Sequence, residues 1–154
     1  MTDIAFYHLQ RSPLEVVLPR LLQRTVDSGK RALVIAGSAE RVESLNAALW
    51  TFDPAAWLPH GSDKDGRPAD QPVWLTAQDD KRSADNKNGA QFLFLTDGAD
   101  VDDLGPYERC FDLFDGNDAM AVEAARTRWT RLKAAGHALT YWQQSETGQW
   151  NKIS

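Results

Sequence analysis

Apolar residues recur along the first half of the chain with two different spacings, which predict alternating strands and helices. The short apolar runs 4–9 and 31–36 are typical of buried strands. Between them, apolar side chains recur every three or four residues, as on a helix with one buried face; these are Leu14, Val17, Leu18, Leu21, Leu22 and Val26. Buried strands joined by helices form parallel sheets with right-handed crossovers. The predicted fold is therefore α/β, a Rossmann-like three-layer sandwich with a mostly parallel sheet and helices on both faces.

The ends of the first two helices carry recognisable signals. The segment 12–15 (Ser-Pro-Leu-Glu) has the form of a capping box with its proline at the first helical position. Pro19 predicts a kink within this helix, and Gly29 predicts its end. Ser38 is the predicted N-cap of the second helix, which should end near Trp50.

The second half of the chain predicts the remaining elements. Strands are expected over 73–76, 91–95 and 109–114, a helix over 119–135, and a last edge strand over 138–142. The stretches 61–71 and 77–90 are polar or rich in glycine and proline, and are predicted loops. Residues 1–142 are expected to form a single domain. Residues 143–154 are expected to be a polar C-terminal tail with no packing pattern apart from Trp150.

The helix predicted over 119–135 carries a local positive charge on an acidic protein. It contains four basic side chains, Arg126, Arg128, Arg131 and Lys133, against the single acidic Glu123, whereas the whole chain has a formal charge of −5. A nucleic-acid duplex binder spreads its basic charge over a wider face. This local surface suits an acidic peptide better.

Composition narrows the class of protein. A chain of 154 residues with 42% hydrophobic and 25% charged residues is typical of one globular domain. Cys110 is the only cysteine, so no internal disulfide can form, and its apolar neighbours predict a buried thiol. The N-terminal residues have neither a basic nor an apolar leader region, and no apolar run is long enough to cross a membrane. A cytoplasmic protein is expected.

The candidate motifs for catalysis and cofactor binding are incomplete in this sequence. Gly29-Lys30 lacks the following Ser or Thr of a phosphate-binding loop, and no G-x-G-x-x-G follows the first strand. His8, His60 and His137 share no metal-ligand spacing with one another or with Cys110. We therefore expect no catalytic residue, no metal and no cofactor, and the protein is not predicted to be an enzyme.

Five short motifs resemble a known family. They are Phe6-Tyr7, Ser28-Gly29-Lys30-Arg31, Ala48-Leu49-Trp50, Trp57-Leu58-Pro59-His60 and the segment 126–136. Together they cover about residues 4 to 142, in the order and close to the spacing of the chi subunit of the bacterial DNA polymerase III holoenzyme. The chain resembles this family.

The resemblance implies a non-catalytic accessory subunit of the clamp-loader assembly, with a nucleotide-binding-like sandwich that uses no nucleotide. Chi proteins bind the acidic C-terminal tail of single-stranded DNA-binding protein, which ends in a Pro-Phe carboxylate. They also bind the small psi subunit, and in some bacteria a repair helicase instead. Nucleic acid is then contacted only indirectly, and no membrane is involved.

The resemblance places a tail-peptide site on the basic helix. Arg126, Trp129, Thr130 and Lys133 share one helical face. A guanidinium can hold a carboxylate in two hydrogen bonds, and an aromatic beside it can line a pocket for the final phenylalanine. Arg126 and Trp129 occupy the family's carboxylate-binding and aromatic positions. Spacing alone also allows Trp129 to be a core residue.

Some positions depart from the family pattern. Thr130 stands where well-studied members have a lysine, and Ala121 or Val122 replaces another basic residue. These changes predict weaker attraction for an acidic tail unless Arg131 compensates. A one-residue difference in length leaves either Phe114 or Asp115 at the apolar position of the pocket, and Phe114 is the chemically better choice.

A second group of aromatics follows the second helix. Trp50 and Trp57 lie within eight residues of each other and match family positions associated with psi or helicase binding. Exposed tryptophans are enriched in interfaces, but these two residues can also close off the core. Two other classes of function stay open, a direct single-stranded nucleic-acid-binding module that uses the same basic helix and a nucleotide-dependent enzyme.

Overall fold

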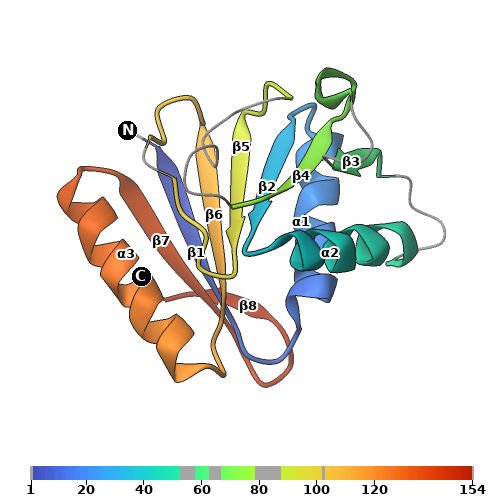
Figure 1. The fold of residues 1–154 in the computed structure, drawn as a ribbon. Coiled ribbons are helices and arrows are strands. Elements are labelled where there is room, and N and C mark those ends of the chain that lie inside the picture. Colours follow the sequence, from blue (N-terminus) through green and yellow to red (C-terminus); the bar gives the residue numbers. More distant parts are fainter. Residues whose placement is uncertain (1, 53–57, 63–66, 79–87, 102, 154) are drawn as a thin grey trace.

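The computed structural model describes residues 2–52, 58–62, 67–78, 88–101 and 103–153, and the predicted alternation of strands and helices is present in it (Figure 1). The elements follow one another as β1 (Asp3–Leu9), α1 (Leu14–Asp27), β2 (Ala32–Ala36), α2 (Ala39–Thr51), β3 (His60–Ser62), a short 3-10 turn (Pro68–Asp70), β4 (Val73–Ala77), β5 (Phe92–Thr96), β6 (Arg109–Asp115), α3 (Ala119–Ala134), β7 (Ala138–Gln144) and β8 (Trp150–Lys152). No described helix is both long enough and apolar enough to span a lipid bilayer.

The strands form one eight-stranded sheet in the order β3-β4-β2-β5-β6-β1-β7-β8. Every neighbouring pair is parallel except β7–β8, which is antiparallel. β1 lies between β6 and β7, so that Phe6 is paired with Asp112 on one side and with Tyr141 on the other. The predicted α/β fold with a mostly parallel, Rossmann-like sheet is confirmed.

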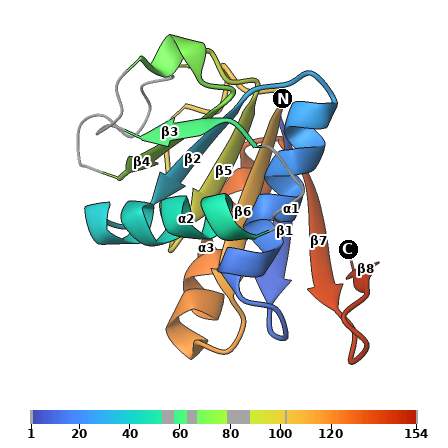
Figure 2. The same cartoon turned by 90° about the vertical axis from the view of Figure 1, so that its right-hand side faces the viewer.

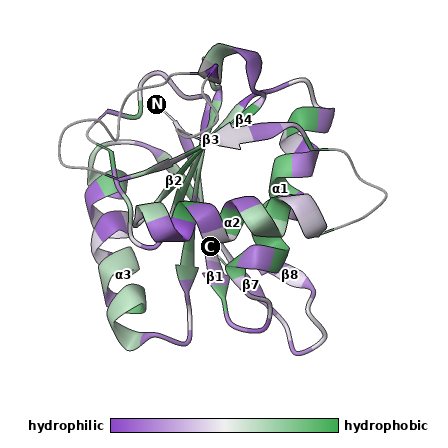
Figure 3. Ribbon diagram, turned by 45° about the vertical axis from the view of Figure 1, so that its right-hand side comes forward, coloured by the Kyte–Doolittle hydropathy of each residue, from purple (hydrophilic) through white to green (hydrophobic). Residues whose placement is uncertain are grey.

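The helices lie on both faces of the sheet (Figures 1 and 2). Because side chains alternate along a strand, Ala5 and Leu9 face a core shared with α1 and α2, whereas Ile4 and Phe6 face the core beneath α3. Figure 3 shows that the central strands are mainly hydrophobic, as expected of strands covered on both sides. Of the described helices, only α3 therefore lies over this face of the sheet, next to β1, β6 and β7.

The predicted capping box before α1 is wrong. Pro13 is the N-cap and makes no side-chain hydrogen bond to the helix. The Ser12 hydroxyl instead accepts a hydrogen bond from Gln144 Nε2 at 3.1 Å, and the Glu15 carboxylate reaches Arg41. Both side chains therefore form tertiary contacts in place of the hydrogen bonds of a capping box. The cap of α2 is confirmed, because Ser38 Oγ accepts from the Arg41 backbone N–H at 3.1 Å.

The sequence predicts a polar tail without a packing pattern apart from Trp150 after residue 142, and in the structure this segment contains strand residues. β7 continues to Gln144, and the chain turns back so that β8 pairs with it. The Trp150 ring meets the Tyr7 ring edge-on at 5.0 Å, which anchors the returning strand to β1. β3 was also missed, because its sequence, His-Gly-Ser, lies inside a stretch that is polar and rich in turn formers.

Candidate functional site

The helix α3 is held against the sheet by a buried ion pair. The Arg128 guanidinium donates from Nε to Asp112 Oδ2 at 2.7 Å and from Nη2 to Oδ1 at 2.9 Å. The two side chains are only 8% and 3% exposed. Arg128 follows the buried Ala125 by three residues and therefore shares its inward face. The sequence-based count of four basic residues on the helix surface was wrong for this one.

Burial dominates the titration of the groups beneath α3. Desolvation raises the pKa of the Asp112 carboxyl, while the hydrogen bonds and charge of Arg128 oppose that change. The fully buried Cys110 thiol has a pKa well above its usual value, mainly because of desolvation. The predicted buried thiol is confirmed. A thiol of this kind is a poor nucleophile at neutral pH.

The other basic side chains of α3 differ in the ion pairs that they form. Arg131 Nη2 lies 2.7 Å from Asp100 Oδ2. Within the described residues, the only ion-pair contact of Arg126 is a long one of 3.9 Å to Glu123, and both side chains are three-quarters exposed. Arg126 therefore presents the guanidinium most available to an incoming anion. Lys133 is exposed further along the same helix.

A pocket of about 490 Å³ opens beside Arg126. Phe6, Phe114 and Tyr141 line it from the sheet, Val122, Ala125, Arg126, Trp129 and Thr130 line it from α3, and Ile153 lines it from the residues after β8. The structure thus brings together four of the five predicted tail-site residues, and leaves Lys133 outside the pocket. Phe114 lines this pocket and Asp115 does not, although both residues line a second hollow.

Trp129 is both a core residue and a pocket residue, the two roles that its helical spacing allowed. Its ring meets Phe6 edge-on at 5.3 Å and Tyr141 at 6.0 Å, as part of the core beneath α3. The same half-buried side chain forms a wall of the pocket. One tryptophan can therefore support the helix and offer an aromatic surface to a ligand.

The floor of the pocket rests on His8, which the sequence analysis considered only as a metal ligand. His8 Nδ1 shares a hydrogen bond of 2.5 Å with the Tyr141 hydroxyl, and its ring lies 5.1 Å from that of Phe114. Burial is the main cause of a lowered His8 pKa, and Arg126 lowers it further, while the Gly116 backbone and Asp115 act in the opposite direction. His8 and Tyr141 come from strands 133 residues apart in the sequence, so no local pattern could have paired them.

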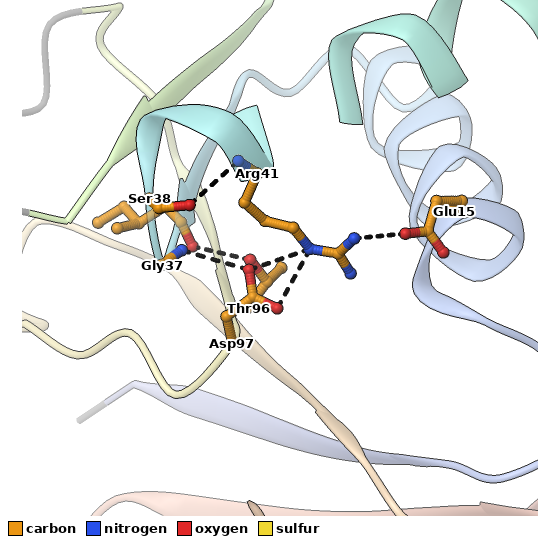
Figure 4. Close-up of polar contacts among 7 residues, drawn as sticks. Glu15, Gly37, Ser38, Arg41, Thr96 and Asp97 are labelled. Atoms are coloured by element: carbon orange, nitrogen blue, oxygen red, sulfur yellow. Dashed lines mark hydrogen bonds and ion pairs between the residues drawn. The ribbon is translucent and has the colours of Figure 1, made fainter. Parts of the chain in front are cut away.

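A second hollow, of about 750 Å³, lies at the carboxyl ends of β1, β5 and β6. Proteins of this architecture commonly hold phosphates there, at helix N-termini. Here Arg41 is clamped between Glu15 (2.5 Å) and Asp97 (3.2 Å), and Asp97 Oδ2 also accepts from the Gly37 N–H at 3.3 Å (Figure 4). Asp118 caps α3 through Met120 N at 3.0 Å. The chain's own carboxylates occupy these positions and would repel a phosphate.

An exposed tryptophan, Trp50, lies near β3, at the opposite edge of the sheet from β7 and β8. Trp50 is 65% exposed at the end of α2, and its ring lies 4.6 Å from that of His60. His60 Nδ1 donates to the Leu58 carbonyl at 2.8 Å, which holds the imidazole in place. Trp50 is thus not a core residue. Trp57 lies outside the described residues, as do its neighbours 53–56.

The described part of the chain contains no cluster of three or more potential metal ligands. The fold and the pocket together define a Rossmann-like protein with an apolar pocket beside an exposed guanidinium, and with carboxylates at the usual phosphate positions. The chain matches the family of the DNA polymerase III chi subunit, HolC, over residues 1–140, and it belongs to that family. It is also similar to a probable DNA polymerase III subunit chi from Rickettsia prowazekii (strain Madrid E). The two are 23% identical over 161 residues, which cover 100% of this chain and 93% of the relative. Members of this family are accessory subunits of the replicative polymerase.

Proposed function

We propose that this chain binds the acidic C-terminal tail of single-stranded DNA-binding protein and links it to the polymerase III clamp-loader assembly, without a catalytic step of its own. The observation that carries the proposal is the three-quarters exposed Arg126 guanidinium at the rim of an apolar pocket. A C-terminal apolar residue combines a carboxylate and a side chain on one carbon atom. The guanidinium and the pocket are complementary to these two groups.

The pocket is complementary to an aromatic terminal side chain. Trp129 and Tyr141 are partly exposed and offer aromatic surface to a ligand, while the buried Phe6 and Phe114 pack behind them. Aromatic rings pack favourably edge to face with one another. Thr130 lies within the pocket, where its hydroxyl donates to the Arg126 carbonyl at 3.1 Å. This leaves the guanidinium of Arg126 as the basic group that lines the pocket.

Charge outside the pocket supports an acidic peptide over a longer polyanion. Lys133 is exposed one helical turn beyond the pocket and can attract the preceding acidic residues through screened interactions. Arg131 and Arg128 are engaged by Asp100 and Asp112. A single-stranded nucleic-acid site needs a continuous basic groove with stacking platforms, and α3 offers only a short cationic segment.

A binding competition tests this proposal against direct nucleic-acid binding. A fluorescent peptide of several aspartates ending in Pro-Phe should bind with micromolar affinity, and more weakly as salt rises, since a few ion pairs and one buried ring hold it. Labelled single-stranded DNA of mixed sequence should bind far more weakly at the same salt. Tight DNA binding without peptide binding would overturn the proposal. A melting-temperature shift on addition of ATP or NAD would instead revive a nucleotide-dependent enzyme.

We also propose that Trp50, together with Trp57, contacts a second protein of the assembly, psi or a functional equivalent, or a repair helicase. The exposure of the Trp50 ring supports this, because large exposed aromatics are enriched in interface hot spots. The site lies at the β3 side of the sheet, whereas the pocket lies beside β7 and α3 at the other side. One subunit can therefore hold two partners at once.

Replacing Trp50 by alanine should remove this second partner while the protein stays folded. A side chain that is 65% exposed contributes little to stability, so the free energy of unfolding should change by about 0.5 kcal/mol or less. The measurement is a pull-down from native cell extract with wild type and Trp50→Ala, accompanied by urea unfolding curves. Met120→Ala is the matched control, since Met120 is an equally apolar side chain with 82% exposure on α3. Loss of the same co-purifying protein in both variants would contradict a specific role of Trp50.

A further inference from the structure

The β7–β8 hairpin returns the chain to the pocket beside α3. β8 ends at Lys152, and the backbone N–H of the next residue, Ile153, donates to the Tyr141 carbonyl at 2.7 Å. Tyr141 is the pocket residue whose hydroxyl is hydrogen-bonded to His8. The segment after β8 is thus tied to the same strand position that forms the floor of the pocket.

The strand register determines which way Ile153 faces. Trp142 is paired with Lys152 in the antiparallel ladder, so Ile153 lies opposite Tyr141. Because neighbouring side chains alternate between the two faces of a sheet, Ile153 shares the face of Tyr141, on the side of α3. Its side chain lines the pocket together with Arg126 and Trp129.

Ile153 is nevertheless 58% exposed, one of the few large apolar side chains at the surface of the described chain. An isoleucine at a pocket rim loses contact with water only when something apolar lies over it, and that burial is favourable by about 25 cal/mol for each Å². The pocket therefore has an apolar wall of its own that α3 does not supply, placed beside the exposed Arg126.

We propose that Ile153 is a specificity-determining wall of the pocket, which packs against the terminal apolar side chain of a bound acidic peptide. This inference rests on the proposed peptide-binding function. The β7–β8 hairpin is then part of the binding site. Arg126 selects a free carboxylate, and Ile153 and Trp129, which line the same pocket, select a large side chain on the same terminal residue. Peptides that end in a small residue gain little from Ile153, since their side chain does not reach it.

The test measures the affinity of two peptides for Ile153→Ala and Ile153→Asp. One peptide ends in Pro-Phe and the other in Pro-Ala, with the same acidic residues before them. Ile153→Ala should weaken the Phe-ended peptide about tenfold, from the loss of apolar contact area, and should weaken the Ala-ended peptide less than about twofold. Ile153→Asp should weaken both more strongly, because a carboxylate would lie beside that of the peptide.

Val16→Ala is the matched control, because Val16 is also an exposed apolar side chain but lies on α1 and does not line the pocket. It should leave both affinities unchanged, and thermal unfolding should show that all variants are folded. One outcome is that wild type binds the Phe-ended peptide and Ile153→Ala binds it equally well or more tightly. That result would contradict the role of Ile153 and would leave the proposed peptide-binding function intact. If wild type binds neither peptide, the proposed function itself fails, and this inference with it.

Discussion

Arg126→Ala is expected to weaken binding of the acidic tail peptide by about tenfold to a hundredfold. A charge-assisted, two-pronged hydrogen bond to a carboxylate contributes about 1.5–3 kcal/mol, and each 1.4 kcal/mol corresponds to roughly a factor of ten in affinity. Arg126 can supply this contact because its side chain is 75% exposed and its only described ion-pair contact is 3.9 Å long. The measurement is fluorescence anisotropy with a labelled peptide at fixed salt.

Lys133→Ala is the control for Arg126, because it removes the same charge from the same helix outside the pocket. It should weaken binding only a few-fold, and the effect should disappear as salt rises, since an exposed charge acts at a distance through screened attraction. Neither substitution should alter the unfolding free energy by more than about 0.5 kcal/mol, because exposed charges contribute little to stability.

Amidation of the peptide's C-terminus identifies the group that Arg126 binds. If the guanidinium receives the terminal carboxylate, amidation should weaken wild type strongly and Arg126→Ala hardly at all, since the contact is already lost. Equal losses in both proteins would show that the carboxylate is bound elsewhere. Arg131, at 54% exposure, would then be the next residue to replace, whereas Arg128 is excluded by its burial against Asp112.

Asp112→Ala is expected to cause the largest loss of stability, about 3–5 kcal/mol, because it leaves the buried Arg128 guanidinium without its partner. Both of the hydrogen bonds that fix α3 to β6 through this pair, at 2.7 and 2.9 Å, would be lost. The measurement is urea unfolding followed by far-UV circular dichroism, with the slope m checked to confirm that the transition stays two-state.

Arg131→Ala provides the contrast, since it breaks the ion pair with Asp100, whose two side chains are 54% and 31% exposed. That loss should be under about 1 kcal/mol. The double variant Asp112→Ala/Arg128→Met should regain part of the stability, because an apolar side chain at this position needs no charged partner. A loss for Asp112→Ala no larger than that for Arg131→Ala would show that the buried pair does not hold the helix.

One interpretation of α3, that of Arg128, differs between the sequence and the structure, and the reason is geometric. A count of charges along the helix treats Arg128 as part of a basic surface, but its three-residue spacing from the buried Ala125 turns it towards Asp112. The partner carboxylate is 16 residues earlier in another strand, where helical periodicity carries no information. Arg126, by contrast, lies at the edge of the inward face, where its side chain is 75% exposed.

The candidate pocket was only partly predictable for a similar reason. Arg126, Trp129 and Thr130 share a helical face that spacing alone establishes. Tyr141 and Ile153 could not be added to them from the sequence, since both depend on the pairing of β7 with its neighbours. The choice between residues 114 and 115 was open for another reason, a one-residue difference in length from the family pattern; in the structure Phe114 lines the pocket beside Arg126 and Asp115 does not.

The sequence by itself determined the order of the helices and of every strand except β3 and β8, because runs of Leu, Ile, Val and Phe and their spacing encode which faces must be buried. It also determined the resemblance to the chi family, through short motifs that follow one another in the family's order. Only the tertiary structure decided which basic side chains of α3 are exposed and which form close ion pairs with a carboxylate. It also decided that the chain after residue 142 returns as β8 and brings Ile153 to the pocket. These outcomes depend on contacts between residues far apart in the chain, which form only when the sheet is assembled, and local propensity cannot specify them.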